Sequence, residues 1–410
     1  MDVELEKIFS QAREKALLMI PGPTEIPWRV ILAMMKPSCN HHDPKFNVDV
    51  LDDTLIKLRQ VFQTQNEIIA VPGSGRVGQQ AAINSVVEPG DKVLSIVAGI
   101  FGGWMKEMAG RIGAEVEEYS VEWGAGLDLE KVEKILQTGK FKALTVVHNE
   151  TTTGAMYPIG ELGRLTQKYQ VLFIVDSVSS LGGVDIRTDE WGIDINLTAS
   201  HKCIASPIGL ALLSISQKAW TVMERRRTPA VDFAYDLYRW KRMWIPPERG
   251  GELIFGFRRQ PITMPVHLVF ALQEAVRMIL EESIANRFRR HHVAAEAVRN
   301  AVQALGLRLF PEKDIASDTV TAVNVPEGVD GRKVANIMQE TYGVIIARGL
   351  EKLATRIWRI PHMGMTASPD FALPTLNAFE RALISQGYPA KLGKGVEAAS
   401  GVFNAMPITR

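Results

Sequence analysis

The stretch VLFIVDSVSS at residues 171–180 decides the fold, because an unbroken apolar run ends there in a single acid, Asp176. A short, continuous apolar run is typical of a strand that is buried on both faces. Three similar runs precede it, IIAVPG at 68–73, KVLSIV at 92–97 and ALTVVH at 143–148, with helical stretches between them. Strands that alternate with helices predict a mostly parallel sheet covered by helices on both faces.

The pattern continues and then changes along the chain. The runs INLTAS at 195–200 and LALLSIS at 210–216 are close together and predict an antiparallel edge of the same sheet. After Pro265, apolar residues at helical spacing predict a long helix that bridges two domains. The runs TVTAVNV at 319–325, GVIIA at 343–347 and RIWRI at 356–360 then alternate with helical stretches near 331–341 and 370–386. We therefore expect an N-terminal arm over residues 1–20, a large α/β domain over 21–280 and a smaller α+β domain over 281–410.

Composition excludes several classes of function. Lys and Arg total 47 against 46 for Asp and Glu, so no global charge favours nucleic acid or an anionic membrane surface. Cys39 and Cys203 are the only cysteines, which excludes a disulfide scaffold and suits a reducing compartment. The N-terminus lacks a secretory signal, and no segment of about 18 apolar residues would span a membrane. We expect a cytoplasmic protein.

Three short segments carry candidate chemistry, and each has a simpler interpretation. Gly73-Ser74-Gly75-Arg76 between a strand and a helix would form a phosphate cradle, or only a turn. Asp176 at a strand end would keep a pyridinium nitrogen protonated, or cap a helix. Lys202, in Ser-His-Lys-Cys, would form an imine with an aldehyde cofactor, or remain a solvated charge.

The order of these segments, with Lys202 26 residues after Asp176, resembles the class V aminotransferases, the fold type I group that contains alanine–glyoxylate and serine–glyoxylate aminotransferases. The resemblance runs from Pro21-Gly22-Pro23-Thr24 to the C-terminal helices. It implies pyridoxal 5'-phosphate as cofactor and a large domain with a mostly parallel, seven-stranded type of sheet.

The resemblance also assigns roles. Lys202 matches the lysine that forms the Schiff base and moves the α-proton, and Asp176 matches the partner of the ring nitrogen. The other residues that match cofactor contacts are Ser74, Gly75, Arg76 and His201 for the phosphate, Phe101 and Val178 for the two ring faces, and Thr151 for a cofactor or substrate oxygen. Thr263 matches a phosphate contact from the second subunit, which implies a homodimer with shared active sites. Arg359, with backbone near Gly22, matches the group that holds the substrate carboxylate.

The amino donor depends on three positions at which relatives differ. His41, after Asn40, lies in a segment that often reads Gly-His in glyoxylate enzymes. Gln260 stands where alanine–glyoxylate enzymes usually have Tyr and ureidoglycine–glyoxylate enzymes an amide, which can pair with a ureido group. Arg348 stands where pyridoxamine–pyruvate aminotransferases have a second arginine. The role of residues 228–259 stays open.

The prediction is therefore an aminotransferase that transfers the amino group of a small amino acid, of alanine or serine type, to glyoxylate or pyruvate by a ping-pong mechanism. Ureidoglycine–glyoxylate and pyridoxamine–pyruvate transfer are the alternatives. A lyase on the same cofactor is a further one, but a cysteine desulfurase needs a later catalytic cysteine, and none follows Cys203. A regulatory protein would carry a nucleic-acid-binding segment. The eight histidines show no ligand spacing, so we expect no metal, and the run Arg287, Arg289, Arg290 predicts a solvated helix face.

Overall fold

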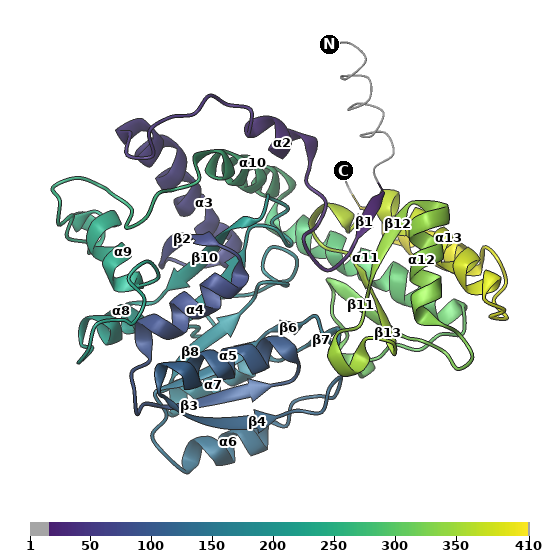
Figure 1. Cartoon of the computed structure of the whole chain (residues 1–410), viewed down its shortest axis with the longest axis horizontal. Helices are drawn as coiled ribbons and strands as arrows, with labels where there is room; N and C mark the ends of the chain where they lie inside the picture. The colour runs from purple at the N-terminus through teal and green to yellow at the C-terminus, as the bar shows by residue number, and fades with distance from the viewer. Residues whose placement is uncertain (1–15, 409–410) are drawn as a thin grey trace.

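The computed structural model describes residues 16–408, so the first fifteen residues of the expected N-terminal arm lie outside it. A seven-stranded sheet forms the centre of the larger part of the molecule (Figure 1), in the order β2-β10-β9-β8-β5-β3-β4. In chain order its strands are β2 (Glu67–Gly73), β3 (Lys92–Val97), β4 (Glu115–Ser120), β5 (Ala143–Val147), β8 (Leu172–Asp176), β9 (Ile195–Ala199) and β10 (Gly209–Ile215). The predicted α/β fold with a mostly parallel sheet is confirmed.

One strand differs from the sequence prediction. β10 is antiparallel, as expected, but it lies inside the sheet, because it pairs with β9 on one side and with β2 on the other. The edges are β2 and β4. β4 was not predicted, because its sequence EVEEYS carries three acids and lacks an apolar run.

Helices enclose this sheet and bring chain segments to its carboxyl edge. They are α2 (Trp28–Ala33), η1 (Phe46–Asp52), α3 (Asp53–Phe62), α4 (Gly75–Val86), α5 (Ile100–Ile112), α6 (Leu129–Gln137), α7 (Ile159–Lys168), α8 (Gln217–Glu224), α9 (Leu237–Trp244), η2 (Pro247–Arg249) and α10 (Val266–Glu282). α4 packs against β2, β9 and β10, and α5 packs against β3 and β5. A two-stranded hairpin of β6 (Asn149–Glu150) and β7 (Ala155–Met156) follows β5.

The smaller part of the molecule has its own sheet, in the order β1-β12-β13-β11. Its strands are β1 (Leu17–Met19), β11 (Val320–Asn324), β12 (Val344–Arg348) and β13 (Ile357–Pro361), and its helices are α11 (Ile284–Ala304), η3 (Lys313–Ile315), α12 (Gly331–Tyr342), η4 (Glu351–Leu353), η5 (Gly364–Thr366), α13 (Pro369–Ser385) and α14 (Lys394–Ala405). β1, near the start of the chain, therefore pairs with β12 of the smaller part. Each of the two parts has its own cluster of buried apolar side chains. The domain boundary near residue 280 stays a prediction.

The predicted bridging helix is two helices. α10 ends at Glu282, and α11 begins at Ile284 after Ser283, whose φ of +66° interrupts the helical backbone. α10 packs against α2 and α3 of the larger part, whereas α11 packs against α13 and α14. No helix within residues 16–408 combines the length and apolar character that crossing a membrane requires.

Candidate active site

Lys202 lies in the turn after β9, where the two parts of the molecule meet. Its side chain is largely enclosed, and Nζ donates a hydrogen bond to the carbonyl of Pro21. Burial and the nearby positive charge of Arg359 lower the pKa of Lys202 to about 8. The interpretation as a solvated charge is therefore wrong, and about a tenth of the amine is neutral at pH 7.

Asp176 ends β8 on the same edge of the sheet. Its Oδ1 accepts a hydrogen bond from the Val178 amide at 2.8 Å, and its Oδ2 accepts one from the Gln79 side chain at 2.5 Å. Burial raises the pKa of Asp176 to about 7, against the opposing effect of these hydrogen bonds and of Lys202. A buried carboxylate at this edge can pair with a protonated ring nitrogen.

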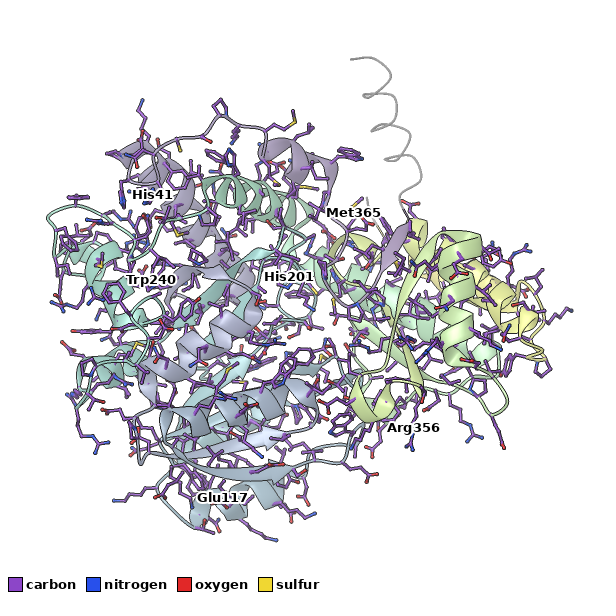
Figure 2. The ribbon with its side chains drawn as sticks, viewed as in Figure 1. His41, Glu117, His201, Trp240, Arg356 and Met365 are labelled. Atoms are coloured by element: carbon purple, nitrogen blue, oxygen red, sulfur yellow. The ribbon has the colours of Figure 1, made fainter. Side chains whose placement is uncertain are left out.

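A cavity of about 200 Å³ joins these two groups. It brings together eight of the residues that the sequence predicted for the cofactor: Ser74, Gly75, Arg76, Phe101, Asp176, Val178, His201 and Lys202. Figure 2 shows the labelled His201 in the middle of the molecule, between the larger and the smaller part. Four further lining residues, Gln79, Val147, Asn149 and Ser179, were not predicted.

The Gly-rich turn forms the start of α4 at this cavity. Ser74 is the N-cap residue, and its side chain makes no capping hydrogen bond. A Cβ atom on Gly75 would lie 2.6 Å from Cγ2 of Val178, so only glycine allows this close approach. The exposed amides and the partial positive charge of a twelve-residue helix favour an anion here. Arg76 adds a guanidinium, which stacks 3.6 Å from the centre of the Trp104 ring.

Phe101 is held at the cavity by a buried acid that the sequence analysis missed. Glu150 accepts hydrogen bonds from the amides of Phe101 at 3.2 Å and Gly102 at 3.3 Å, at the start of α5. Burial raises the pKa of Glu150. The sequence contains a feature that could have indicated this residue: Glu150 is the only acid in His-Asn-Glu-Thr-Thr-Thr-Gly, the same motif from which Thr151 was predicted.

Arg359 lies on β13, an internal strand, and it is only 7% exposed. Nε donates to the carbonyl of Arg348 at 2.9 Å, and Nη1 donates to the carbonyl of Thr151 at 3.1 Å. Burial lowers the pKa of Arg359 to about 10, so the side chain stays charged at neutral pH. Nη2 makes no hydrogen bond within residues 16–408, which leaves a donor for a carboxylate.

Gly22 packs directly against the lysine. Its φ is +107°, and a Cβ atom there would lie 2.2 Å from Nζ of Lys202. A side chain at this position would therefore displace the amine.

The other predicted residues, Gly22 and Arg359 included, do not line the cavity within one chain. His41 contacts the ring of His42, with 3.9 Å between centroids, and in Figure 2 it lies well apart from His201. The buried amide of Gln260 donates to Asn47 at 2.8 Å. Thr263 and Arg348 are exposed, and Thr151 meets the site through its carbonyl.

The basic run on α11 is a solvated face only in part, because Arg289 is exposed but Arg287 is buried and Arg290 is partly buried. Arg287 is buried and donates to the carbonyls of Gly182, at 2.8 Å, and of Cys203. Its charge is paired with Glu282 at 2.8 Å. The side chain therefore supports the turn that carries Lys202 from behind.

The lining of the cavity fits pyridoxal 5'-phosphate. Three buried polar atoms of lining residues have no hydrogen-bond partner within residues 16–408: Oε1 of Gln79, Oδ1 of Asn149 and Nδ1 of His201. Unpaired buried polar atoms are costly, so they indicate a polar ligand. Burial and the adjacent Lys202 lower the pKa of His201 to about 4, so its ring is neutral. No group of three or more His, Cys, Asp or Glu side chains among the described residues could hold a metal ion.

The fold and the lysine-centred pocket together define a pyridoxal-phosphate-dependent enzyme. Residues 17–232 match the family described as aminotransferase class-V. An uncharacterized aminotransferase of Methanocaldococcus jannaschii is 40% identical to this chain, over 95% of this chain and 98% of its own length. The L-aspartate–glyoxylate aminotransferase of Paracoccus denitrificans is 35% identical, over 93% of this chain and 94% of its own length.

A solved structure agrees with these relatives. The crystal structure of ureidoglycine–glyoxylate aminotransferase from Bacillus subtilis is similar to this chain with a TM-score of 0.89 and 32% identity, over 95% of this chain and 98% of its own. The chain belongs to the class V aminotransferase family, and it is a pyridoxal-phosphate-dependent transaminase.

Proposed function

We propose that this enzyme transfers the amino group of a small amino acid, of alanine or serine type, to glyoxylate or pyruvate. The observation that carries the proposal is the position of Arg359 near Lys202. The positive charge of Arg359 lowers the pKa of Lys202, and Nη2 of Arg359 has no hydrogen-bond partner within residues 16–408. An α-carboxylate bound to Arg359 would bring the adjacent amine toward Lys202. Two of the three relatives use glyoxylate according to their names, and these two differ in the amino donor.

Each residue of the pocket has a task in this reaction. The cofactor, when bound, supplies an electron sink for the bond that breaks at the α-carbon. Lys202 would remove the α-proton and deliver it to the carbon of the cofactor that is bonded to the amino nitrogen. Asp176 holds the ring nitrogen in its protonated form, and Arg359 orients the substrate carboxylate. The two half-reactions use the same groups in opposite order, which gives ping-pong kinetics.

The cofactor contacts beyond these groups belong to the same proposal. The start of α4, with Ser74, Gly75 and Arg76, binds the phosphate, and His201 assists it. Phe101 and Val178 cover the two faces of the ring, because a flat aromatic and a branched apolar side chain flank the cavity. Thr151 contacts a cofactor or substrate oxygen, since its backbone already meets Arg359.

We also propose that the active unit is a homodimer. Thr263 and His41 would contribute to the site of the partner subunit, since neither is buried in its own chain and neither lines the cavity there. Several large apolar side chains are exposed in the segments near them, including Met35 at 76%, Phe255 at 49% and Phe257 at 52%. Exposed apolar area of this kind is typical of a protein interface.

A second donor, ureidoglycine, is favoured by one observation. Oε1 of Gln260 is buried and has no hydrogen-bond partner within residues 16–408. A carboxamide with a free acceptor can receive a hydrogen bond from a ureido group. Pyridoxamine is the alternative that Arg348 would support, because the Arg348 carbonyl accepts a hydrogen bond from Nε of Arg359 at 2.9 Å.

The test is a comparison of half-reactions. The purified holoenzyme is mixed with alanine, serine, aspartate, ureidoglycine or pyridoxamine, and the visible absorbance of the cofactor is followed; glyoxylate or pyruvate is then added. We expect alanine or serine to remove the absorbance fastest and glyoxylate or pyruvate to restore it. Loss with ureidoglycine alone would move the assignment to the second donor. If no donor changes the spectrum, the proposal is wrong.

We propose the cytoplasm as the compartment of the enzyme. Cys39 and Cys203 are both free thiols, and Cys203 is adjacent to Lys202. Unpaired thiols persist in a reducing environment.

A further inference from the structure

Gln79 is a buried amide on the floor of the cavity to which neither the sequence motifs nor the proposed reaction assigns a role. It lies in the second turn of α4 and is 2% exposed. Its Nε2 donates to Oδ2 of Asp176 at 2.5 Å, and the same residue lines the cavity. The contact joins residues that are 97 positions apart in the chain.

The orientation of the amide follows from the chemistry of its partner. An ionised carboxylate only accepts hydrogen bonds, so the NH2 group of Gln79 must face Asp176. The other carboxylate oxygen accepts from the Val178 amide at 2.8 Å. Both oxygens are therefore held, one by a helix and one by the backbone of the turn that follows β8.

The charges around Asp176 show why a donor matters there. Glu150 disfavours the ionised carboxylate, Lys202 favours it, and burial raises the pKa of Asp176 to about 7. His148 lies beside the strand end, since its amide donates to the Asp176 carbonyl, and burial lowers the pKa of its ring to about 4, so it adds no charge at neutral pH. Hydrogen bonds to the ionised form oppose the cost of burial.

The same helix also begins at the predicted phosphate site. Gly75 and Gln79 are four residues apart on α4 and share one face of the helix. A single rigid element thus sets the distance between the anion-binding turn and the acid. An error in the placement of α4 would affect both ends of the site together.

We propose that Gln79 is a positioning residue for the cofactor: its amide holds the Asp176 carboxylate in the orientation and the ionised form in which it pairs with the ring nitrogen. Gln79 would act on the ring nitrogen through Asp176. The alternative is a packing role, in which any side chain of similar length would serve.

Replacement by methionine separates the two roles, because Gln79→Met keeps the length of the side chain and removes the donor. Gln80→Met is the matched control, since Gln80 is the next residue of α4 and makes no hydrogen bond to Asp176. The first readout is the 15N chemical shift of the ring nitrogen in holoenzyme that is loaded with 15N-labelled pyridoxal phosphate. The second is the dissociation constant of the cofactor.

We expect Gln79→Met to move the ring-nitrogen shift toward that of the unprotonated ring, because a carboxylate without its donor takes the shared proton more readily. Each unit by which the pKa of Asp176 rises above the assay pH weakens cofactor binding about tenfold. Gln80→Met should match the parent in both readouts. A parent-like shift and affinity in Gln79→Met would overturn the proposal.

Gln79→Glu keeps the test decisive if the methionine variant does not fold. The introduced carboxyl group can donate to Asp176 while it is protonated, whereas its ionised form repels Asp176. The ring-nitrogen shift of this variant should therefore be parent-like at low pH and depart from that of the parent as the pH rises and the introduced carboxyl group ionises. A shift that follows the parent at every pH would contradict the proposed role.

Discussion

Lys202 shows how one residue depends on its surroundings for its chemistry. Burial and the charge of Arg359 lower its pKa from 10.5 to about 8. The neutral amine is the reactive form, and its fraction grows as the pH passes the pKa. We expect the rate at which the apoenzyme combines with pyridoxal phosphate to rise with pH and to level off above about 8, as stopped-flow absorbance would measure.

Arg359→Met should move this midpoint to higher pH, because a positive charge that disfavours the ammonium form is removed. Arg356→Met is the control, since Arg356 lies three residues earlier on the surface and is exposed. A midpoint near the ordinary value for lysine in the parent would show that the amine is not perturbed. Equal midpoints in the two variants would remove Arg359 as a cause.

The second residue-scale prediction concerns the substrate carboxylate. Hydrogen bonds to charged groups contribute about 1.5–3 kcal/mol each, so Arg359→Lys, which loses the planar fork, should raise KM for amino acid donors by about 10- to 100-fold. Pyridoxamine has no carboxylate, and its half-reaction provides an internal control. Steady-state kinetics with both donor types would test this. A similar increase in KM for pyridoxamine would mean that Arg359 does not bind the substrate carboxylate.

Single residues also show how much of the candidate site could be predicted from the sequence. Lys202, Asp176 and Ser74 belong to short motifs at strand ends, so a parallel sheet brings them together at one edge. Gln79 and Glu150 were missed, because their roles depend on which distant backbone or carboxylate they face. No local pattern records those contacts.

At the scale of elements, α4 is the part of the site on which most depends, since the proposed phosphate site lies at its first turn and Gln79 of its second turn donates to Asp176. Gly75→Ala would bring a methyl group to 2.6 Å from Val178. Overpacking costs about 1–3 kcal/mol, so we expect the unfolding free energy to fall by that amount. Cofactor affinity should fall too, because the start of α4 must move. Urea denaturation and cofactor titration would measure the two effects.

Gly110→Ala is the matched control on α5. Gly110 is an internal helical glycine, and an added Cβ there meets nothing within 4 Å. Alanine is favoured over glycine in a helix by about 0.5–1 kcal/mol, so this variant should be more stable than the parent and bind the cofactor normally. If Gly75→Ala were also more stable than the parent and kept the parent affinity for the cofactor, the close approach of α4 to Val178 would not be required for cofactor binding.

The positions of the strands in the sequence were predicted better than the pairing of each strand within the sheet. The apolar runs indicated the positions of six of the seven central strands to within a residue or two, because buried strands must be apolar. The placement of β10 inside the sheet was not predictable, since it depends on pairing with β2, more than a hundred residues earlier. The break at Ser283 was missed because apolar spacing continues across it from α10 to α11.

For the whole molecule, the single chain assembles the cofactor pocket but not every predicted contact. Thr263 is exposed, and Gln260 bonds to Asn47 outside the cavity. The sequence motifs indicate which residue types form the site, but they do not indicate which chain of the proposed dimer contributes a given side chain. This division between what one chain builds and what a dimer would complete is open to a direct experiment.

The experiment uses hybrid dimers, obtained by coexpression of two differently tagged chains. In a hybrid of Lys202→Ala with Thr263→Ala, the intact lysine of one chain would meet the intact Thr263 of the other, so one of the two sites should bind pyridoxal phosphate with parent affinity. The Thr263→Ala homodimer should bind about tenfold more weakly, as expected for one hydrogen bond to a charged group.

Arg359→Met provides the matched control, because Arg359 and Lys202 face each other within one chain. A hybrid of Lys202→Ala with Arg359→Met contains no complete site, so its amino acid half-reaction should stay as slow as in the Arg359→Met homodimer. The two hybrids thus predict opposite outcomes from the same design: recovery where the contact crosses between chains, and none where it stays within a chain. If the Thr263→Ala hybrid binds the cofactor no better than its homodimer, Thr263 does not act across the interface.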